Sequence, residues 1–404
     1  MKNINIGELG IHLHKYPFIY AIVNKLWEYS QYSLRIIFIF LRLFKIHPNK
    51  IVISNIHGRG YSDHPKYILE EINQQSHEWD IVWILNGSLT DSELPQNIRT
   101  VKENSLKSFY ELATAKLWID NAEKRLFVLK RNGQYYLQTW HGFGPKKNID
   151  KESTAGNRVE THFKHNAKMI DAYVSNNDML TKFYRDEFHY EGEVLKIGFP
   201  RNDILINEES PVIREKVFSK YSLSPDTKVV LYAPTYRPNT NLEIYHIDCD
   251  GILSSLEKKY GGVWICLLRL HPVIARLSSS LQTDAKRVID ASNYLDMQEL
   301  LLVSDVLITD YSSCMFDFAL TKRPCLLYHP DILEYENSRG FSIPPKELPF
   351  PAFHSSEELI YGITTFNYEE YIQNINSFYD ACNMYEPGDA SRKAVEWITE
   401  RMRL

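Results

Sequence analysis

The chain has 404 residues, which is more than one ordinary domain holds and enough for two. Apolar residues make up 44% and charged residues 24%, a composition that excludes an intrinsically disordered chain. The net charge is −5; residues 1–50 carry seven Lys or Arg against two Glu, or +5, so the remainder carries −10. An acidic bulk of this kind argues against nucleic-acid binding over a broad surface.

The cysteines and the N-terminus indicate the cellular compartment. The five cysteines contain no Cys-x-x-Cys pair, which predicts reduced thiols packed as small apolar groups, without disulfides or a zinc site. The first ten residues are polar and of mixed charge, so no secretory signal is expected.

Residues 17–46 form an aromatic-rich segment with four Lys or Arg. Its longest apolar run, residues 36–41, has six residues, whereas a membrane-spanning helix needs about 18 or more. Basic and aromatic side chains around a short apolar run are typical of helices that lie in an anionic membrane interface. The alternative is a helical hairpin packed against the body of the protein.

Short apolar runs alternate with helical patterns from Lys50 onward. Runs that are apolar throughout predict strands buried on both faces, as in a parallel sheet covered by helices. In the first half, the predicted strands are 50–55, 81–85, 117–120, 135–140 and 172–175, and the predicted helices are 65–75, 105–113 and one ending near 166–170.

A second series of the same kind begins after a predicted helix near 211–221, which places the domain boundary near 205–225. Its predicted strands are 229–233, 263–270, 288–290, 306–309 and 325–327, and its predicted helices are 251–260 and 296–303. A last helix near 390–402 could cross back to the first half. Two sequential α/β halves predict two doubly wound domains facing a cleft, with ligands at the carboxyl ends of the strands.

The stretch from Ser304 to Tyr328 predicts a strand, a tight polar turn, a short helix and a second strand. Its turn offers backbone N–H groups at the start of a helix together with the hydroxyls of Ser312 and Ser313, an arrangement suited to phosphate. We therefore predict that the two serines hold a diphosphate, and that Asp310 braces the turn on this donor side rather than acting as a base.

His141 follows a predicted strand and precedes two glycines and two lysines. Gly142 lets a substrate approach the backbone, and Lys146 and Lys147 offer positive charge. Histidine titrates near neutral pH, so His141 is a candidate base for an attacking hydroxyl. A histidine that only hydrogen-bonds a loop is equally compatible with these residues.

Two further clusters contain arginine. Arg201 and Asp203 lie in a turn with Gly and Pro, where ligand contact, an interdomain salt bridge and a helix cap are all open. Thr235 and Arg237 follow a predicted strand, where a hydroxyl and a guanidinium can hold a phosphate; a surface arginine is the alternative.

A last cluster pairs Arg269 with His271 at the end of the predicted strand 263–270. Because side chains alternate along a strand, both point to the same face, and we predict a catalytic or phosphate-binding role for them. One Asp-x-Asp sequence, residues 248–250, is read as a helix N-terminus with Asp250 as the N-cap, so no metal site is expected.

Six motifs together resemble those of one family. They are Trp140-His141-Gly142, Gly198-Phe199-Pro200-Arg201-Asn202-Asp203, Tyr232-Ala233-Pro234-Thr235-Tyr236-Arg237, Leu270-His271-Pro272, Thr309-Asp310-Tyr311-Ser312-Ser313 and Arg339-Gly340-Phe341. Over roughly residues 50–385 their order and spacing resemble the CDP-glycerol glycerophosphotransferases, the polyol-phosphate transferases of teichoic-acid and capsule synthesis.

The resemblance implies a GT-B-like fold of two Rossmann-like domains and two essential histidines, His141 and His271. It implies a CDP-glycerol or CDP-ribitol donor, with Arg339 on the donor side, and a lipid-linked or polymer acceptor reached from the first half. The expected organisation is a membrane-associating lead (1–49), an acceptor domain (50–210), a donor domain (211–385) and a C-terminal helix (386–404).

Two departures from the family pattern concern the histidine motifs. The family usually has His-Gly-Thr-Pro-Leu-Lys, where this chain has Phe143, Gly144 and Pro145 before Lys146, and often Leu-His-Pro-His, where this chain has Val273. The changed loop after His141 faces the side expected for the acceptor, so the identity of the acceptor stays open.

The implied reaction is metal-free phosphoryl transfer at the cytoplasmic face of the membrane. The donor pyrophosphate is expected on Ser312 and Ser313, with Thr235, Arg237 and His271 around it. His141 takes the proton of an acceptor hydroxyl, which attacks the β-phosphorus and releases CMP. The resemblance does not choose glycerol over ribitol phosphate, and a homo-oligomer is compatible with it. The alternatives are a GT-B nucleotide-sugar glycosyltransferase and a non-catalytic nucleotide-binding partner.

Overall fold

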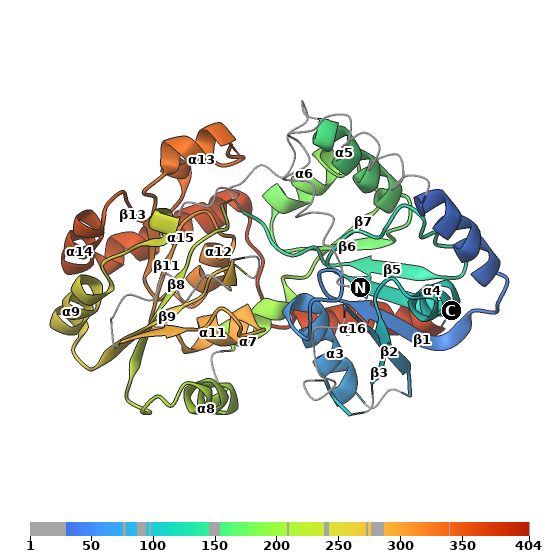
Figure 1. The fold of residues 1–404 in the computed structure, drawn as a ribbon, viewed down its shortest axis with the longest axis horizontal. Helices are drawn as coiled ribbons and strands as arrows, with labels where there is room; N and C mark the ends of the chain where they lie inside the picture. Colours follow the sequence, from blue (N-terminus) through green and yellow to red (C-terminus); the bar gives the residue numbers. More distant parts are fainter. Residues whose placement is uncertain are drawn as a thin grey trace.

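The computed structural model describes residues 30–75, 78–86, 94–96, 98–144, 154–207, 210–237, 242–271, 274–275, 287–338 and 340–403. Two α/β domains lie side by side, each built on its own parallel sheet (Figure 1). This confirms the predicted GT-B-like class. Most of the lead segment and the predicted site residues Lys146, Lys147 and Arg339 lie outside the described residues.

The N-terminal sheet has seven parallel strands in the order β3-β2-β1-β4-β5-β6-β7. Its central strands are apolar and buried on both faces, as their uninterrupted apolar runs predict. The strands are β1 (His47–Ser54), β2 (Asp80–Leu85), β3 (Arg99–Lys102), β4 (Ala115–Asp120), β5 (Tyr135–Gln138), β6 (Ala172–Ser175) and β7 (Glu193–Lys196). The helices of this half are α3 (Asp63–Gln74), α4 (Leu106–Thr114), α5 (Thr154–Ala167) and α6 (Asp178–Asp186).

The C-terminal sheet has six parallel strands in the order β10-β9-β8-β11-β12-β13. The strands are β8 (Lys228–Ala233), β9 (Trp264–Leu268), β10 (Val288–Asp290), β11 (Val306–Thr309), β12 (Cys325–Tyr328) and β13 (Ala352–Phe353). Its helices are α8 (Pro211–Lys220), α9 (Cys249–Tyr260), α11 (Met297–Val303), α12 (Cys314–Ala319), α13 (Ile332–Ser338), α14 (Ser356–Thr365) and α15 (Tyr368–Cys382). Asp248, not Asp250, is the N-cap of α9, because its carboxylate accepts from the Gly251 N–H.

Short elements and one long helix connect the domains. The links are η2 (Pro200–Asn202), α7 (Asp203–Ile206) and α16 (Ala390–Arg403). Ala394, Val395 and Ile398 of α16 are fully buried in the core of the N-terminal domain, so the end of the chain returns to the first half. Asp203 determines where α16 begins, because its carboxylate accepts from the N–H groups of Ala390 and Ser391 at 2.9 and 2.7 Å.

A buried ion cluster joins the two domains below the cleft. Lys66 of α3 donates to Asp296 and Glu299 at the start of α11, both at 2.6 Å. All three side chains are nearly excluded from water, at 6%, 4% and 3% exposure. Attraction between charges is strong in such surroundings, so this contact fixes α3 against α11.

The described part of the lead segment begins with a helix over residues 30–41, which packs on the N-terminal domain through Phe38, with Leu34 and Leu41 partly buried beside it. Phe38 is fully buried and meets the edge of Phe127 with ring centroids 6.3 Å apart. The neighbouring apolar residues point outward, with Phe40 65% and Leu43 80% exposed. Among the described residues, no helix has the length and apolar character needed to cross a bilayer.

Candidate active site

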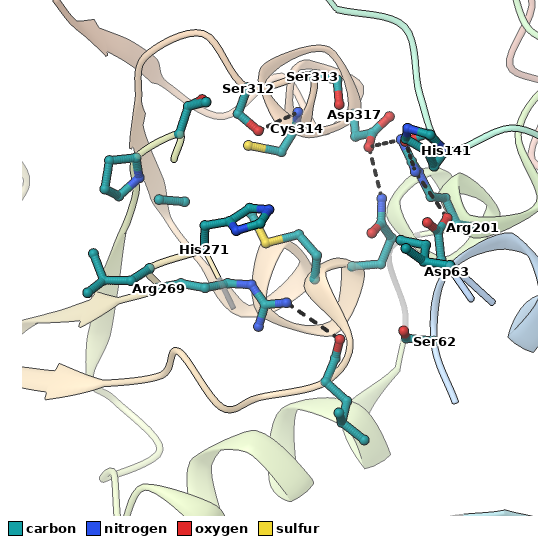
Figure 2. A pocket seen from close by; sticks show the side chains of 18 residues that line it. Ser62, Asp63, His141, Arg201, Arg269, His271, Ser312, Ser313, Cys314 and Asp317 are labelled. Carbon is teal, nitrogen blue, oxygen red and sulfur yellow. Dashed lines mark hydrogen bonds and ion pairs between the residues drawn. The ribbon is translucent and has the colours of Figure 1, made fainter. Parts of the chain in front are cut away.

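A cavity of about 300 Å³ lies between the two domains, at the carboxyl ends of their strands. Figure 2 shows Asp63, His141 and Arg201 of the N-terminal half on one side and Arg269 and His271 on the other, with Ser312 and Ser313 above them. This position agrees with the general rule for ligands of doubly wound sheets. Of the predicted residues, the cavity brings together His141, Arg201, Thr235, Arg269, His271, Ser312 and Ser313.

The polar turn after β11 is held from behind by Asp310. The Asp310 carboxylate is 3% exposed and accepts from the N–H of Thr235 at 2.9 Å and from that of Tyr311 at 2.5 Å. These bonds tie the end of β8 to the end of β11, which brings Thr235 beside the serines. Asp310 is not among the residues that line the cavity, which agrees with its predicted role of bracing the turn on the donor side.

Three hydroxyl groups face the cavity on its donor side. Ser313 is the N-cap of α12 yet makes no capping bond with its side chain, which leaves the hydroxyl for a ligand. Thr235 Oγ1 is buried and has no hydrogen-bond partner in the described part of the chain. A buried hydroxyl without a partner costs free energy until a ligand satisfies it. Because α12 has only six residues, we attribute the site to these hydroxyls and not to a helix dipole.

The two predicted phosphate-binding arginines differ in their surroundings. Arg237 is 4% exposed and already bound by Asp310 at 2.9 Å and by Asp331 at 2.7 Å, and it is not among the cavity-lining residues. Its burial excludes the alternative of a surface arginine, while its contact with phosphate stays a prediction; in the structure Arg237 braces the turn together with Asp310. The reason is that two carboxylates meet it, and the sequence gives no sign of Asp331.

Arg269 lines the cavity and brings a positive charge to it. Its guanidinium donates to the backbone carbonyls of Tyr294 and Leu295 and forms no ion pair with a described carboxylate. Burial lowers the pKa of Arg269, as expected for a cation taken from water without a bound anion. An anionic ligand in the cavity would offset this cost, so Arg269 is the better candidate for phosphate.

A backbone carbonyl fixes the orientation of His141. The ring Nδ1 lies 2.9 Å from the oxygen of Asn121, so Nδ1 carries the proton and Nε2 carries the lone pair. Trp140, which adopts a left-handed φ of 55°, stacks beside the ring at 4.1 Å. A strained backbone at this point turns the chain sharply out of β5 and brings His141 into the cleft.

Arg201 connects His141 to both domains. Its guanidinium donates to the His141 carbonyl at 2.9 Å and to Asp63 of α3 at 3.0 Å, and it pairs with Asp317 of α12 at 2.8 Å. Burial alone would raise the pKa of Asp63, but the Arg201 charge together with the contributions of His64 outweighs burial, and the pKa is lowered. Of the alternatives left open for Arg201, the structure places it in an interdomain salt bridge.

The loop after His141 lies directly on the donor turn. A Cβ atom at Gly142, where φ is 133°, would lie 2.9 Å from Ser313 Oγ and 3.0 Å from Arg201 Nη2. The glycine is therefore needed for close approach of the two domains, not only of a substrate. Asp203, in contrast, accepts from the first N–H groups of α16 and does not line the cavity, so of the alternatives left open for it the structure shows the helix cap.

Comparison with known proteins identifies the family. The model of the CDP-glycerol:poly(glycerophosphate) glycerophosphotransferases matches residues 36–400. The chain belongs to this family. A teichoic acid poly(glycerol phosphate) polymerase of Bacillus spizizenii is 33% identical over 92% of this chain and 98% of its own length. A teichoic acid glycerol-phosphate transferase of Staphylococcus aureus is 30% identical over 93% of this chain and 98% of its own length. The chain spans about half the length of two further poly(glycerol phosphate) polymerases.

A solved glycerophosphotransferase has the same fold. The wall teichoic acid polymerase TagF, in a variant soaked with CDPG, superposes with a TM-score of 0.80 at 27% identity, and the match covers 99% of both chains. The predicted family and enzyme class, transfer of an alditol phosphate from a CDP-alditol in teichoic-acid synthesis, are thereby confirmed.

Sequence reasoning missed three polar residues of this glycerophosphotransferase site, namely Asp63, Asn121 and Asp317. Asn121 orients His141 and donates to Asp63 at 3.1 Å; Asp317 holds Arg201 from the donor side. The signal for Asn121 was its place directly after a strand of the same sheet as His141. Asp317 had no such signal, because its position inside the sequence of a short helix does not show which partner it meets.

Proposed function

We propose that this glycerophosphotransferase transfers glycerol phosphate from CDP-glycerol to a hydroxyl of a membrane-linked acceptor and releases CMP. The observation that carries the proposal is the position of His141, which lines the same cavity as Ser312, Ser313, Arg269 and His271 and has its ring held through Nδ1. The two relatives named above that match nearly full length are a poly(glycerol phosphate) polymerase and a glycerol-phosphate transferase, which favours glycerol over ribitol.

The proposed reaction is an in-line displacement at the β-phosphorus. Ser312, Ser313 and Thr235 hold the diphosphate oxygens, while Arg269 and His271 neutralise their charge. The acceptor oxygen forms a bond to the β-phosphorus as the bond to the CMP oxygen breaks. The proton of the acceptor hydroxyl passes to His141 Nε2, and the CMP oxygen leaves with the bonding electrons.

We further propose that the reaction needs no metal ion. The carboxylates that line the cavity, Asp63 and Asp317, are both bound to Arg201 and are poor candidates for metal ligands. Positive charge comes instead from Arg269 and His271. Turnover measured in excess chelator should equal that of the untreated enzyme. Complete loss of turnover that magnesium restores would overturn this part of the proposal.

The membrane-facing surface in this proposal is the helix over residues 30–41. Exposed Ile36 and Phe40 of this helix, and Leu43 and Phe44 of the turn after it, lie near a basic hollow of about 380 Å³ that is lined among others by Arg35, Lys164 and Lys168. Figure 1 shows this helix beside α5, at the edge of the N-terminal domain away from the donor domain. Apolar side chains beside cations suit an anionic bilayer surface.

The membrane proposal is tested with substitutions that leave Phe38 in place. Phe40→Asp combined with Leu43→Asp should abolish sedimentation with vesicles that contain anionic lipid. The matched control is Leu333→Asp, which changes an equally exposed leucine (73%) on α13 of the other domain and should not affect sedimentation. Equal binding of the wild type and the double variant would contradict the assignment of this surface.

The reaction is tested by measuring CMP release from CDP-glycerol and from CDP-ribitol, each with a lipid-linked acceptor. The expected result is a kcat/KM at least about tenfold higher with CDP-glycerol. Faster turnover of CDP-ribitol would overturn the choice of alditol. Release of a nucleoside diphosphate from a sugar donor would favour a glycosyltransferase, and an unchanged cellular role after His141→Ala would favour a non-catalytic partner.

A further inference from the structure

A second, smaller cavity adjoins the active site on the other side of His141. It has a volume of about 90 Å³ and is lined by residues 140–144, by Leu180 and Phe183 of α6, and by Ser313. His141 and Ser313 are the residues that it shares with the large cavity. The acid–base group and one donor hydroxyl therefore stand between two separate spaces.

The two cavities open toward different sides of the N-terminal domain. The large cavity reaches Asp63 at the start of α3, whereas the small one reaches α6. Figure 1 shows α3 and α6 on opposite edges of the N-terminal sheet, with α5 next to α6. The small cavity therefore reaches His141 beside α6, and the large cavity reaches it beside the start of α3.

The chemistry of the small cavity suits a polyol. Trp140, Phe143 and Phe183 offer aromatic surface, which packs against C–H groups, while His141 and the Ser313 hydroxyl offer hydrogen bonds. The Trp140 ring is anchored by Phe188 at 4.6 Å, so the wall beside His141 is rigid. A volume of about 90 Å³ is the space of roughly three water molecules at about 30 Å³ each, so the cavity admits only a small group such as the end of a polyol.

We propose that this cavity, formed by Trp140, Phe143, Leu180 and Phe183, binds the terminal polyol unit of the acceptor, a group of glycerol size. The inference rests on the proposed function, because it takes His141 as the base. With the polyol in this cavity, its terminal hydroxyl lies at His141 and faces the β-phosphorus in the large cavity. Phe183 limits the length of the polyol, since it forms the α6 wall opposite the histidine loop.

The test changes the size of the cavity in both directions. Phe183→Trp fills it and should raise the KM for an acceptor that ends in glycerol phosphate by about tenfold or more. The affinity for CDP-glycerol, measured by calorimetry, should stay within about twofold. Phe183→Ala enlarges the cavity and should raise the ratio of kcat/KM for a ribitol-ended over a glycerol-ended acceptor by about fivefold.

The matched control is Met179→Trp, which adds an indole at a 36%-exposed position of the same helix and should leave both constants unchanged. The proposed subsite would be refuted by an acceptor KM that is the same in the Phe183→Trp variant and the wild type. It would also be refuted if the variant bound CDP-glycerol and the acceptor more weakly by the same factor. If Phe183→Trp does not fold, the ratio for Phe183→Ala decides alone. Wild-type protein that releases no CMP from CDP-glycerol would instead refute the proposed function.

Discussion

Replacing Arg201 by methionine tests whether one guanidinium holds the catalytic loop, α3 and α12 together. Arg201 is 5% exposed, and the side chains of its partners Asp63 and Asp317 are 14% and 7% exposed. Methionine fills a similar volume but leaves two nearly buried carboxylates without a cation. Breaking a buried ion pair in this way costs about 3–5 kcal/mol, so we expect the free energy of unfolding to fall by that amount.

The loss of unfolding free energy in Arg201→Met should be larger at high pH than at low pH. Burial already raises the pKa of Asp317, and removal of the guanidinium removes the main group that opposes the rise. The folded variant then binds protons that the unfolded chain has released, so its free energy of unfolding rises as the pH falls from about 8 toward the unfolded pKa near 4. Protonation makes Asp317 neutral and relieves the unpaired charge.

The assay is urea unfolding followed by tryptophan fluorescence at pH 8 and pH 5.5, with Arg201→Met/Asp317→Asn as the paired variant. The double variant should recover part of the lost free energy at pH 8, because one of the two unpaired charges is gone. Turnover should fall up to about 10²-fold in both, since the His141 carbonyl loses its donor. A free energy of unfolding within about 1 kcal/mol of the wild type, or a loss that is the same at both pH values, would refute the reasoning.

Three further predictions concern single side chains. His141→Ala should lower kcat by about 10²–10⁴-fold, whereas Ser313→Ala should weaken CDP-glycerol binding more than His141→Ala does; calorimetry showing the reverse order would mean that the donor turn is misassigned. Glu386 is half-buried and accepts from the Phe199 N–H at 2.9 Å, and desolvation of its carboxylate raises its pKa to about 8. The protein should therefore lose stability as the pH rises from about 4.5 to about 8, and Glu386→Gln should remove that part of the slope in urea titrations. Gly142→Ala places a methyl group 2.9 Å from Ser313 Oγ at a φ of 133° that strains any residue with a Cβ, so both kcat and the melting temperature should fall; unchanged turnover would show that the loop moves away without consequence.

Local patterns in the sequence specify most of the fold. The apolar runs at 51–54, 81–85 and 229–233 are buried strands because only sheets covered on both faces tolerate such runs. The weak or short strands were missed: β3, β7 and β13 are two to four residues long and mostly half-exposed, so their side chains carry no clear alternation. These three segments are strands because each pairs with the neighbouring strand of its sheet, β3 with β2, β7 with β6 and β13 with β12.

The sequence by itself determined the family, the two-domain organisation and the residues that follow strand ends: His141, His271 and the serines of the turn Asp310–Ser313. These are local features, because a strand followed by a turn presents its next side chains at the sheet edge whatever lies opposite. Only the tertiary structure decided which charges meet. Asp331, far along the chain, pairs with Arg237, whereas Arg269 forms no such pair with a described carboxylate. Arg201 likewise became an interdomain link because α3 and α12 bring Asp63 and Asp317 to it. Ion pairs form between side chains that are close in space, and the order of residues along the chain does not show which distant residues will be close.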